Sequence, residues 1–424
     1  MNDSWDILIV GAGLAGLRIG IETLKQFPHI KCCILEQYDY VGGRVFTFRK
    51  HIPRVGNISW ESGAGRISKD HKKVLELLHS YDLHTLPIHS EVEYISTSDL
   101  VPTENHFSNL IQVYLDPLRL LDPSILAQHT LDELLSKTIG PHAAKNFYLQ
   151  FPYFSEIHVL RADVALESFH SEMSSNKGFF VCKEGLSSLT DAMHKEFISL
   201  GGTIQFHTKL ERITYHHGLQ TLHCTVNDSP MTYSASMIVL ALHHSALKQI
   251  DGIRTYKVLE HLKMEPLLRM YAIFPVKNNK SWFTGMPHTV TDSPIRYIIP
   301  IDPSRGIIMI SYTDGGDTQY WKKDDEDRVM QEIRRLFPDK TIPDPIYFKQ
   351  HLWNAGCTYW LPGAYDVKTE SQQSLHPMPE KFPGLFMCGE SFAEHPCWME
   401  SALDQADKLL KHPHFKKGII QFKK

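Results

Sequence analysis

Residues 6–16 read D-I-L-I-V-G-A-G-L-A-G, a strand-like apolar run that leads into three glycines in the spacing G-x-G-x-x-G. A helix-like stretch follows over residues 14–27, and a second apolar run, residues 32–35, ends at Glu36. This order of strand, glycine-rich turn, helix, strand and acid is typical of a Rossmann-type dinucleotide-binding unit. We expect the Glu36 carboxylate to accept hydrogen bonds from an adenosine ribose.

Each glycine of this motif has a separate predicted role. Gly11 permits the tight turn out of the strand, Gly13 lets a pyrophosphate approach the backbone, and Gly16 lets the helix pack closely on the strand. Leu14 and Ala15 open the helix, whose free N–H groups and dipole stabilise bound phosphates without a basic side chain. The motif therefore predicts a dinucleotide site at the start of the chain.

The composition is that of an ordinary globular protein. The chain has 424 residues, 42% of them hydrophobic, and a net charge of −4, so nothing in the charge balance suggests a nucleic-acid partner. No apolar run approaches the roughly 18 residues of a membrane span. The seven cysteines and 25 histidines form no paired ligand or disulfide pattern, so we expect no metal site. We expect a cytoplasmic monomer or homodimer, with residues 412–424 as a solvated basic tail.

The patterns along the chain predict an α/β fold with two interleaved domains. The discontinuous Rossmann-type domain is expected to comprise residues 1–72, 179–258 and 369–424. An inserted substrate domain is expected to have a helical part, residues 73–178, and a sheet part, residues 259–368. The individual elements predicted are a helical region over 72–150, helices over 185–200 and 325–337, and strands over 203–207, 237–241, 267–275, 295–299 and 307–313.

Two further blocks predict contacts to the same cofactor. Gly43 gives a second close approach of the backbone, and Arg44 can meet the pyrophosphate with its guanidinium fork. Near the other end, Gly389 and Glu390 end a strand, and Met399 opens the final helix. If that helix N-terminus faces a flavin, its partial positive charge stabilises the negative charge that develops on reduction.

Together these blocks resemble the FAD-dependent amine oxidase family, which includes monoamine oxidases, polyamine oxidases and L-amino-acid oxidases. Supporting blocks stand in the family's order: ESGAGRI at 61–67, which holds Gly65 and Arg66, GLSSL at 185–189, VLAL at 239–242 and YWLPG at 359–363. The resemblance implies FAD, with the active site at the interface of the two domains. It also implies oxidation of the C–N bond of an amine or L-amino acid to an imine, which hydrolyses to an aldehyde or keto acid plus ammonia. Reoxidation of the flavin by O₂ then gives H₂O₂.

An aromatic cage is expected to hold the amine. Tyr359 and Trp360 match the family's aromatic segment, and Trp398 stands where the last helix begins. A desolvated cage disfavours the ammonium form and so favours the reactive free amine. The alternative is that these side chains are ordinary core aromatics.

Arg66 is the candidate for recognition of a substrate carboxylate. Gly63-Ala64-Gly65-Arg66, followed by His71, resembles the segment of L-amino-acid oxidases whose arginine clamps that carboxylate. The alternative is that Arg66 pairs with a protein carboxylate or a flavin edge in an enzyme for simple amines.

Two positions depart from the family pattern. The family usually has a lysine on a central strand of the substrate domain, where it holds a water for the oxygen reaction, and this chain has Arg269. Arginine is larger and donates its hydrogen bonds from a rigid planar group, so it does not simply replace lysine there. Cys357 stands near the position of the cysteine that carries covalent flavin in monoamine oxidases, but the spacing differs, which favours non-covalent FAD.

Two other functions stay open at this point. A carotenoid desaturase-like or protoporphyrinogen oxidase-like enzyme would keep the fold and act on an apolar substrate. The other is a catalytically degenerate flavoprotein with a structural role, and it is suggested by Arg269 at the position where the family usually has a lysine.

Overall fold

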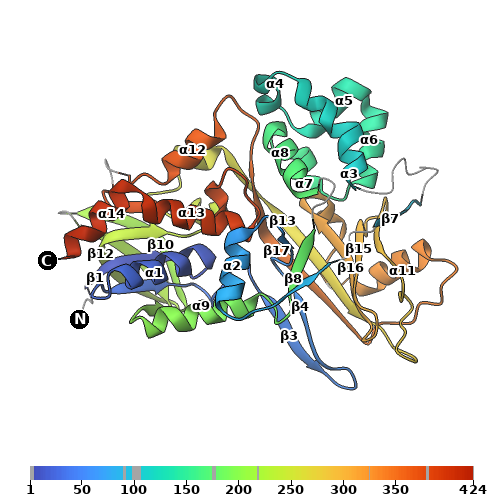
Figure 1. Ribbon diagram of the computed structural model, residues 1–424, viewed down its shortest axis with the longest axis horizontal. Helices are drawn as coiled ribbons and strands as arrows, with labels where there is room; N and C mark the ends of the chain where they lie inside the picture. Colours follow the sequence, from blue (N-terminus) through green and yellow to red (C-terminus); the bar gives the residue numbers. More distant parts are fainter. Residues whose placement is uncertain are drawn as a thin grey trace.

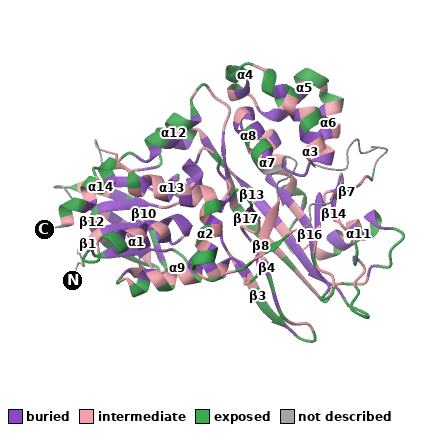
Figure 2. Ribbon diagram, viewed as in Figure 1, coloured by how far each residue is buried: buried purple, intermediate pink, exposed green. Residues whose placement is uncertain are grey.

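The computed structural model describes residues 4–88, 92–97, 107–173, 178–216, 219–323, 325–378 and 382–423. Figure 1 shows two sheets side by side, one near both chain termini and one at the opposite end, with a group of helices above the second. Figure 2 shows that buried residues follow the strands of both sheets, whereas the outer helices are exposed on one side. Within the described residues, no helix is long and apolar enough to cross a membrane.

The first sheet is the predicted dinucleotide-binding sheet. Its central strands β1 (Ser4–Val10), β2 (Cys32–Leu35), β9 (Thr203–Gln205), β12 (Ser229–Leu240) and β18 (Leu385–Met387) are parallel, in the order β9-β2-β1-β12-β18. All four side chains of β2 are buried, as expected for a parallel strand covered on both faces. The covering helices include α1 (Leu14–Gln26), α9 (Ser187–Ser199) and α13 (Met399–Lys411).

The same sheet carries two strands that the sequence patterns did not predict. β10 (Thr208–His216) and β11 (Leu219–Val226) form an antiparallel extension along β12. Asn227 and Asp228 form the turn between β11 and β12 with positive φ angles of 45° and 63°. This left-handed conformation is one that Asn and Asp tolerate in hairpin turns.

The second sheet has the order β17-β13-β16-β15-β14-β7. Its strands are β7 (Val92–Ile95), β13 (Leu262–Ile273), β14 (His288–Thr291), β15 (Tyr297–Asp302), β16 (Ile307–Asp314) and β17 (Tyr347–Trp360). Helix α11 (Glu326–Leu336) packs its apolar side, which includes Val329 and Ile333, into the core on one face of this sheet.

The helical part extends from Phe107 to Met173. Its α-helices are α3 (Phe107–Leu110), α4 (Pro123–Gln128), α5 (Leu131–Ile139), α6 (Pro141–Gln150), α7 (Phe154–His158) and α8 (Ala162–Met173). Helix α5 begins with a capping box, in which Thr130 and Glu133 satisfy each other's backbone N–H groups. The Arg296 guanidinium joins this part to the second sheet, because it donates to the carbonyl oxygens of Tyr148, Leu149 and Phe151.

The expectation of a helical region over residues 72–150 is corrected at its start. Helix α2 (Lys72–Ser80) packs beside α13 of the first domain, where the Glu400 carboxylate accepts the N–H groups of Lys73 and Val74 at 3.0 Å. After it come β6 (Thr85–Pro87), which pairs with β8 (Phe179–Cys182), and β7. Helical spacing of apolar residues did not reveal these short strands, because their partners lie elsewhere in the chain.

The predicted basic tail is also corrected. Helix α14 (Pro413–Ile420) follows α13, and its Phe415 is fully buried against the Phe386 ring at a centroid distance of 5.3 Å. Two apolar residues one helical turn apart, Phe415 and Ile419, bury one side of this helix while its lysines stay exposed. Lys424 lies outside the described residues.

Candidate active site

A cavity of about 1000 Å³ lies between the two domains. Its wall is formed by the start of α1, the turn after β2, residues 63–66, the start of α7, strands β13 and β17, and the residues before α13. Every residue expected from the sequence to bind the cofactor or substrate lines this cavity except Gly16 and Trp360. The lining residues among them are Gly11, Gly13, Leu14, Ala15, Glu36, Gly43, Arg44, Gly65, Arg66, Arg269, Tyr359, Gly389, Glu390, Trp398 and Met399.

The glycines of the first motif shape one end of the cavity. Gly11 has a φ of +104°, and a Cβ there would lie 2.6 Å from the Ala241 carbonyl oxygen. A Cβ on Gly16 would lie 2.0 Å from the Gly11 carbonyl oxygen, so Gly16 serves the packing of α1 rather than the cavity wall. At Gly13 an added Cβ would meet no atom within 4 Å, because this residue borders open space. The backbone at the start of α1 is therefore exposed to a ligand, as a pyrophosphate requires.

Glu36 is nearly buried at the end of β2. Its Oε2 accepts the Ala12 N–H at 2.7 Å, and its Oε1 accepts the Tyr38 N–H at 3.0 Å. Burial raises the pKa of this carboxyl, and the two N–H groups act in the opposite direction. The hydrogen bonds hold the carboxylate at the cavity wall, where its remaining lone pairs can accept ribose hydroxyls.

Arg44 and Glu390 join the two ends of the chain inside the cavity. Arg44 Nη2 lies 2.6 Å from Glu390 Oε2, and Arg44 Nη1 donates to the Gly356 carbonyl oxygen at 2.8 Å. Glu390 Oε1 also accepts the N–H groups of Thr358 and Cys397. This network connects the first domain to β17 and to the segment before α13.

Arg66 presents its guanidinium to the cavity without an ion pair among the described residues. Nη1 contacts the Tyr153 hydroxyl at 3.3 Å, and the guanidinium lies over the rings of Tyr153 and Phe179, at 5.9 and 5.1 Å from their centroids. The alternative that Arg66 pairs with a protein carboxylate therefore finds no support in the described part of the chain. Most of its donors stay available to a ligand.

The expected aromatic cage is only partly present. Tyr359 lines the cavity, and its hydroxyl donates to Glu156 Oε1 at 3.4 Å. Trp360 does not line it, because successive residues of a strand point to opposite faces. Its fully buried indole donates to the Ala393 carbonyl oxygen at 2.8 Å on the other side of β17. The structure therefore places Trp360 in the core, and not in the cage where it was expected.

Trp398 completes the aromatic wall from the start of α13. Its ring is parallel to that of Phe179 at a centroid distance of 6.3 Å and meets the His71 ring edge-on at 4.7 Å. His71 lies behind this wall, and its Nδ1 accepts the Ser68 N–H at 3.1 Å. Burial lowers the pKa of His71 to about 4, so the imidazole is neutral at neutral pH.

Arg269 projects from β13 into the same cavity. Its Nη1 donates to the Glu61 carbonyl oxygen at 3.1 Å, and the guanidinium lies 5.7 Å from the Tyr312 ring centroid. Its buried Nε has no hydrogen-bond partner among the described residues. Arg269 is therefore held by the backbone of Glu61, and its buried Nε–H is still unsatisfied.

Several cavity residues had no recognisable pattern in the sequence. They include Tyr153, Glu156, Tyr312 and Cys397. Tyr153 and Glu156 flank the start of α7, where Asp314 of β16 accepts the N–H groups of Phe154 and Ser155 at 3.0 and 2.9 Å. This contact between the helical part and the second sheet brings both side chains to the cavity, and such long-range contacts leave no local sequence pattern.

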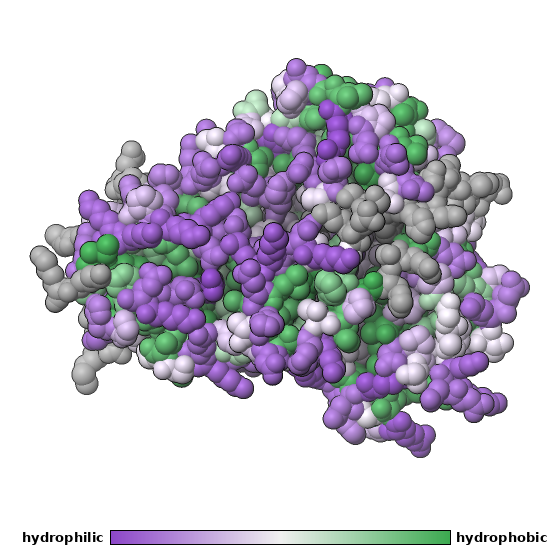
Figure 3. Space-filling model, in the orientation of Figure 1, coloured by the Kyte–Doolittle hydropathy of each residue, from purple (hydrophilic) through white to green (hydrophobic). Residues whose placement is uncertain are grey.

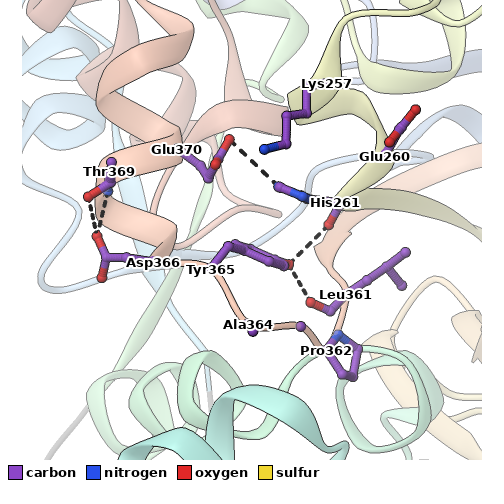
Figure 4. Close-up of a pocket in the computed structure, with 11 residues that line it drawn as sticks. Lys257, Glu260, His261, Leu361, Pro362, Ala364, Tyr365, Asp366, Thr369 and Glu370 are labelled. Atoms are coloured by element: carbon purple, nitrogen blue, oxygen red, sulfur yellow. Dashed lines mark hydrogen bonds and ion pairs between the residues drawn. The ribbon is translucent and has the colours of Figure 1, made fainter.

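A second, smaller hollow of about 470 Å³ lies beside the segment that follows β17 (Figure 4). The Tyr365 ring is parallel to the His261 imidazole at 4.0 Å, and the His261 Nδ1 lies 3.6 Å from Glu370. Asp366 accepts the Thr369 N–H at 2.7 Å and so caps helix α12 (Val367–Ser374). None of the expected site residues lines this hollow, so we assign the chemistry to the larger cavity.

Comparison with known proteins identifies the family. A profile of flavin-containing amine oxidoreductases matches residues 22–408, which is most of the chain. The chain belongs to this family. FAD is its cofactor, and the resemblance inferred from the sequence is confirmed. The open backbone at Gly13 and Gly43 and the carboxylate of Glu36 fit a dinucleotide in the cavity.

Individual relatives are distant from this flavin-containing amine oxidoreductase. An uncharacterized protein of Acanthamoeba polyphaga mimivirus is 20% identical over 492 residues, covering 96% of this chain and 93% of the relative. A putrescine oxidase variant with redesigned cofactor binding has a similar fold, with a TM-score of 0.73 at 15% identity. Wild-type putrescine oxidase bound to putrescine is similar with a TM-score of 0.69, also at 15% identity. Each of the two putrescine oxidase structures is matched over 99% of both chains, and these matches confirm the predicted two-domain α/β fold.

Proposed function

We propose that the protein oxidises the C–N bond of an amine that carries a carboxylate, such as an L-amino acid, to an imine. The imine hydrolyses to a keto acid and ammonia, and O₂ accepts the electrons to give H₂O₂. When bound, FAD supplies the acceptor for the hydride equivalent that leaves the α-carbon. The family membership supports the amine oxidation, and Arg66 is the observation that supports a carboxylate on the substrate.

Arg66 suits a carboxylate because of what surrounds it. Its guanidinium lines the cavity, contacts one hydroxyl and two aromatic rings, and has no ion pair among the described residues. A bidentate guanidinium–carboxylate pair would satisfy two of its donors and fix the orientation of the substrate. The aromatic rings limit access of water and so strengthen that pair.

The second requirement is that the substrate amine be uncharged, and aromatic side chains in the cavity wall favour this form. Tyr359 is 2% exposed, and it shares the cavity wall with the Trp398 ring. A cavity wall of this kind disfavours the charged ammonium relative to the free amine. The chain therefore orients both ends of an amino acid and removes water from the amine, while the cofactor accepts the electrons.

Glu156 favours a second candidate, a diamine. Its carboxylate lines the same cavity beside Tyr359 and can receive a distal ammonium group. A putrescine oxidase that binds a diamine has the same fold, although at 15% identity this likeness extends to the fold alone. The two candidates differ in which charged residue, Arg66 or Glu156, meets the substrate.

The test is anaerobic mixing of the FAD-loaded protein with matched substrates while the flavin absorbance is followed. L-phenylalanine and phenylethylamine differ only in the carboxylate, and putrescine represents the diamines. Bleaching by the amino acid supports the proposal, and bleaching by putrescine alone favours the diamine. If no amine or amino acid bleaches the bound flavin, the proposal fails and an apolar substrate or a degenerate flavoprotein is favoured.

Substitution of Arg66 separates substrate recognition from a general loss of activity. Arg66→Ala is expected to lower kcat/KM for the amino acid by about 10- to 100-fold, because charged hydrogen bonds contribute about 1.5–3 kcal/mol. The same variant should retain turnover of any amine without a carboxylate. Arg254→Ala is the matched control, since Arg254 is an exposed arginine outside the cavity. Equal losses for both substrates would contradict a carboxylate clamp.

A further inference from the structure

Two thiols meet in the wall of the cavity. Cys357 lies on β17, and Cys397 lies two residues before the start of α13. Both side chains line the cavity, and the Cys397 thiol lies 3.2 Å from the carbonyl oxygen of Thr358, the residue next to Cys357. The other five cysteines are buried and do not line the cavity. The fold thus brings one pair of thiols together where a ligand can reach them.

The backbone holds Cys397 in an unusual conformation. Its φ is +77°, a left-handed value that favours glycine and costs other residues about 1–3 kcal/mol. The Glu390 carboxylate accepts the Cys397 N–H at 2.8 Å, and the Cys397 thiol donates to the Thr358 carbonyl oxygen at 3.2 Å. These contacts fix the thiol beside Cys357, so the strained backbone places a sulfur where glycine would be the relaxed choice.

The two thiols are not equivalent. The neighbouring Cys397 side chain lowers the pKa of the Cys357 thiol, and the positive charge of Arg44 acts in the same direction, whereas burial and the Glu390 carboxylate oppose them. Burial raises the pKa of Cys397. Cys357 is therefore the thiol that ionises first and reacts with an oxidant, and Cys397 is placed to resolve the product.

We propose that Cys357 and Cys397 form a redox-active dithiol that hydrogen peroxide closes into a disulfide. The Cys357 thiolate attacks one peroxide oxygen, an S–O bond forms, the O–O bond breaks, and the departing hydroxide takes a proton to become water. The Cys397 sulfur then attacks the Cys357 sulfur, the S–S bond forms, the S–O bond breaks, and a second water leaves. Each dithiol thus loses two electrons and two protons, which reduce one peroxide to two waters.

The source of the oxidant connects this dithiol to the enzyme reaction. The oxidase reaction proposed above would release hydrogen peroxide into the same cavity, and this part of the inference rests on that proposal. The chemistry of the two thiols does not depend on that proposal, because added hydrogen peroxide is an equally suitable oxidant. The disulfide would join β17, which carries Tyr359, to the segment that precedes Trp398, so substrate turnover is expected to fall as the disulfide accumulates.

The experiment uses the full-length protein with FAD bound. Reduced protein is treated with hydrogen peroxide, quenched, denatured in an alkylating reagent and mapped by peptide mass spectrometry. We expect the peptides of Cys357 and Cys397 to appear joined and to separate on reduction with dithiothreitol. The other five cysteines should be alkylated as free thiols, and they serve as the internal control.

Single substitutions test the order of the two steps. In Cys397→Ser, peroxide should leave Cys357 as a sulfenic acid that dimedone captures, with no disulfide. In Cys357→Ser, Cys397 should stay a free thiol over the same time. Retention of the flavin spectrum checks that each variant is folded.

Two results overturn the inference: both thiols remaining free in the folded wild type after peroxide treatment, or flavin staying attached to the Cys357 peptide after denaturation. Neither depends on finding an amine substrate, so the proposed function is tested separately.

Discussion

The Glu390 carboxylate forms an ion pair with the Arg44 guanidinium, with 2.6 Å between Oε2 and Nη2, although the two residues are 346 positions apart in the chain. Arg44 follows the second strand of the dinucleotide-binding sheet, and Glu390 follows its last strand. Gly356 and Thr358 of β17, from the other domain, hydrogen-bond to the same pair. One ion pair thus fixes both ends of the first domain against the sheet that carries Tyr359.

Removal of one partner of this ion pair should destabilise the protein itself. Glu390→Ala leaves the Arg44 charge without compensation in a partly buried place, which should cost about 3 kcal/mol of unfolding free energy. Denaturant unfolding of the FAD-free protein measures this effect apart from cofactor loss. Glu394→Ala is the control, because its ion pair with Lys408 is more exposed and should cost about 1 kcal/mol or less. Equal effects in the two variants would show that the Arg44 pair contributes no more than a surface pair.

Gly13→Val should separate folding from cofactor binding. A side chain at Gly13 meets no protein atom within 4 Å, and its φ of −74° suits any residue, so the fold should persist. The same side chain occupies the space that a pyrophosphate needs, so FAD should be lost. Circular dichroism and the flavin-to-protein absorbance ratio measure the two effects. A fully flavin-loaded variant would contradict the assigned role of Gly13.

The neighbouring aromatics of β17 should behave differently on substitution. Tyr359→Ala should lower amine turnover with flavin retained, because Tyr359 faces the cavity. Trp360→Ala should instead lower the unfolding free energy by about 3–5 kcal/mol, because Trp360 is fully buried in the core. Steady-state kinetics and thermal unfolding of both variants check this division. Normal kinetics in Tyr359→Ala would remove Tyr359 from the substrate site.

Arg269→Lys tests the departure from the family pattern. A lysine would leave space beside the backbone of Glu61 that the arginine now fills, and it presents a compact ammonium that can hold a water. We expect the reduced flavin to react with oxygen several-fold faster, with little change in its reduction by substrate. Stopped-flow measurement of the two half-reactions decides this. An unchanged or slower oxygen reaction would show that Arg269 does not limit this step.

His71 should contribute to the pH dependence of stability. Burial lowers its native pKa from 6.5 to about 4, so between these values the unfolded state binds more protons than the native state. The unfolding free energy should therefore fall as pH decreases through this window, by up to about 3 kcal/mol from this residue. His71→Asn keeps an acceptor for the Ser68 N–H without titrating, so its stability should depend less on pH. Parallel curves for both proteins would exclude this contribution.

The elements nearest to the glycine motif were predicted most closely. The strand over 32–35 is β2, the predicted helix over 14–27 is α1 to within one residue, and Gly201 and Gly202 follow the end of α9 as expected. These features depend on local patterns of apolar residues and glycine. The strands β6 and β7 and the buried helix α14 were not predicted, because their stability comes from distant partners. The domain boundaries and the roles of the individual site residues stay predictions.

The sequence by itself determined the family and the cofactor, and all but two of the site residues expected from it line the cavity, because phosphate-binding glycines, an acid after the second strand and a helix start have fixed local spacings. Only the tertiary structure decided which side of β17 faces the cavity, and so separated Tyr359 from Trp360. It also decided that Arg66 has no ion pair among the described residues and that Cys397 lies against the backbone of β17 next to Cys357. The physical reason is that such contacts join segments far apart in the chain, and their geometry is set by the packing of two domains.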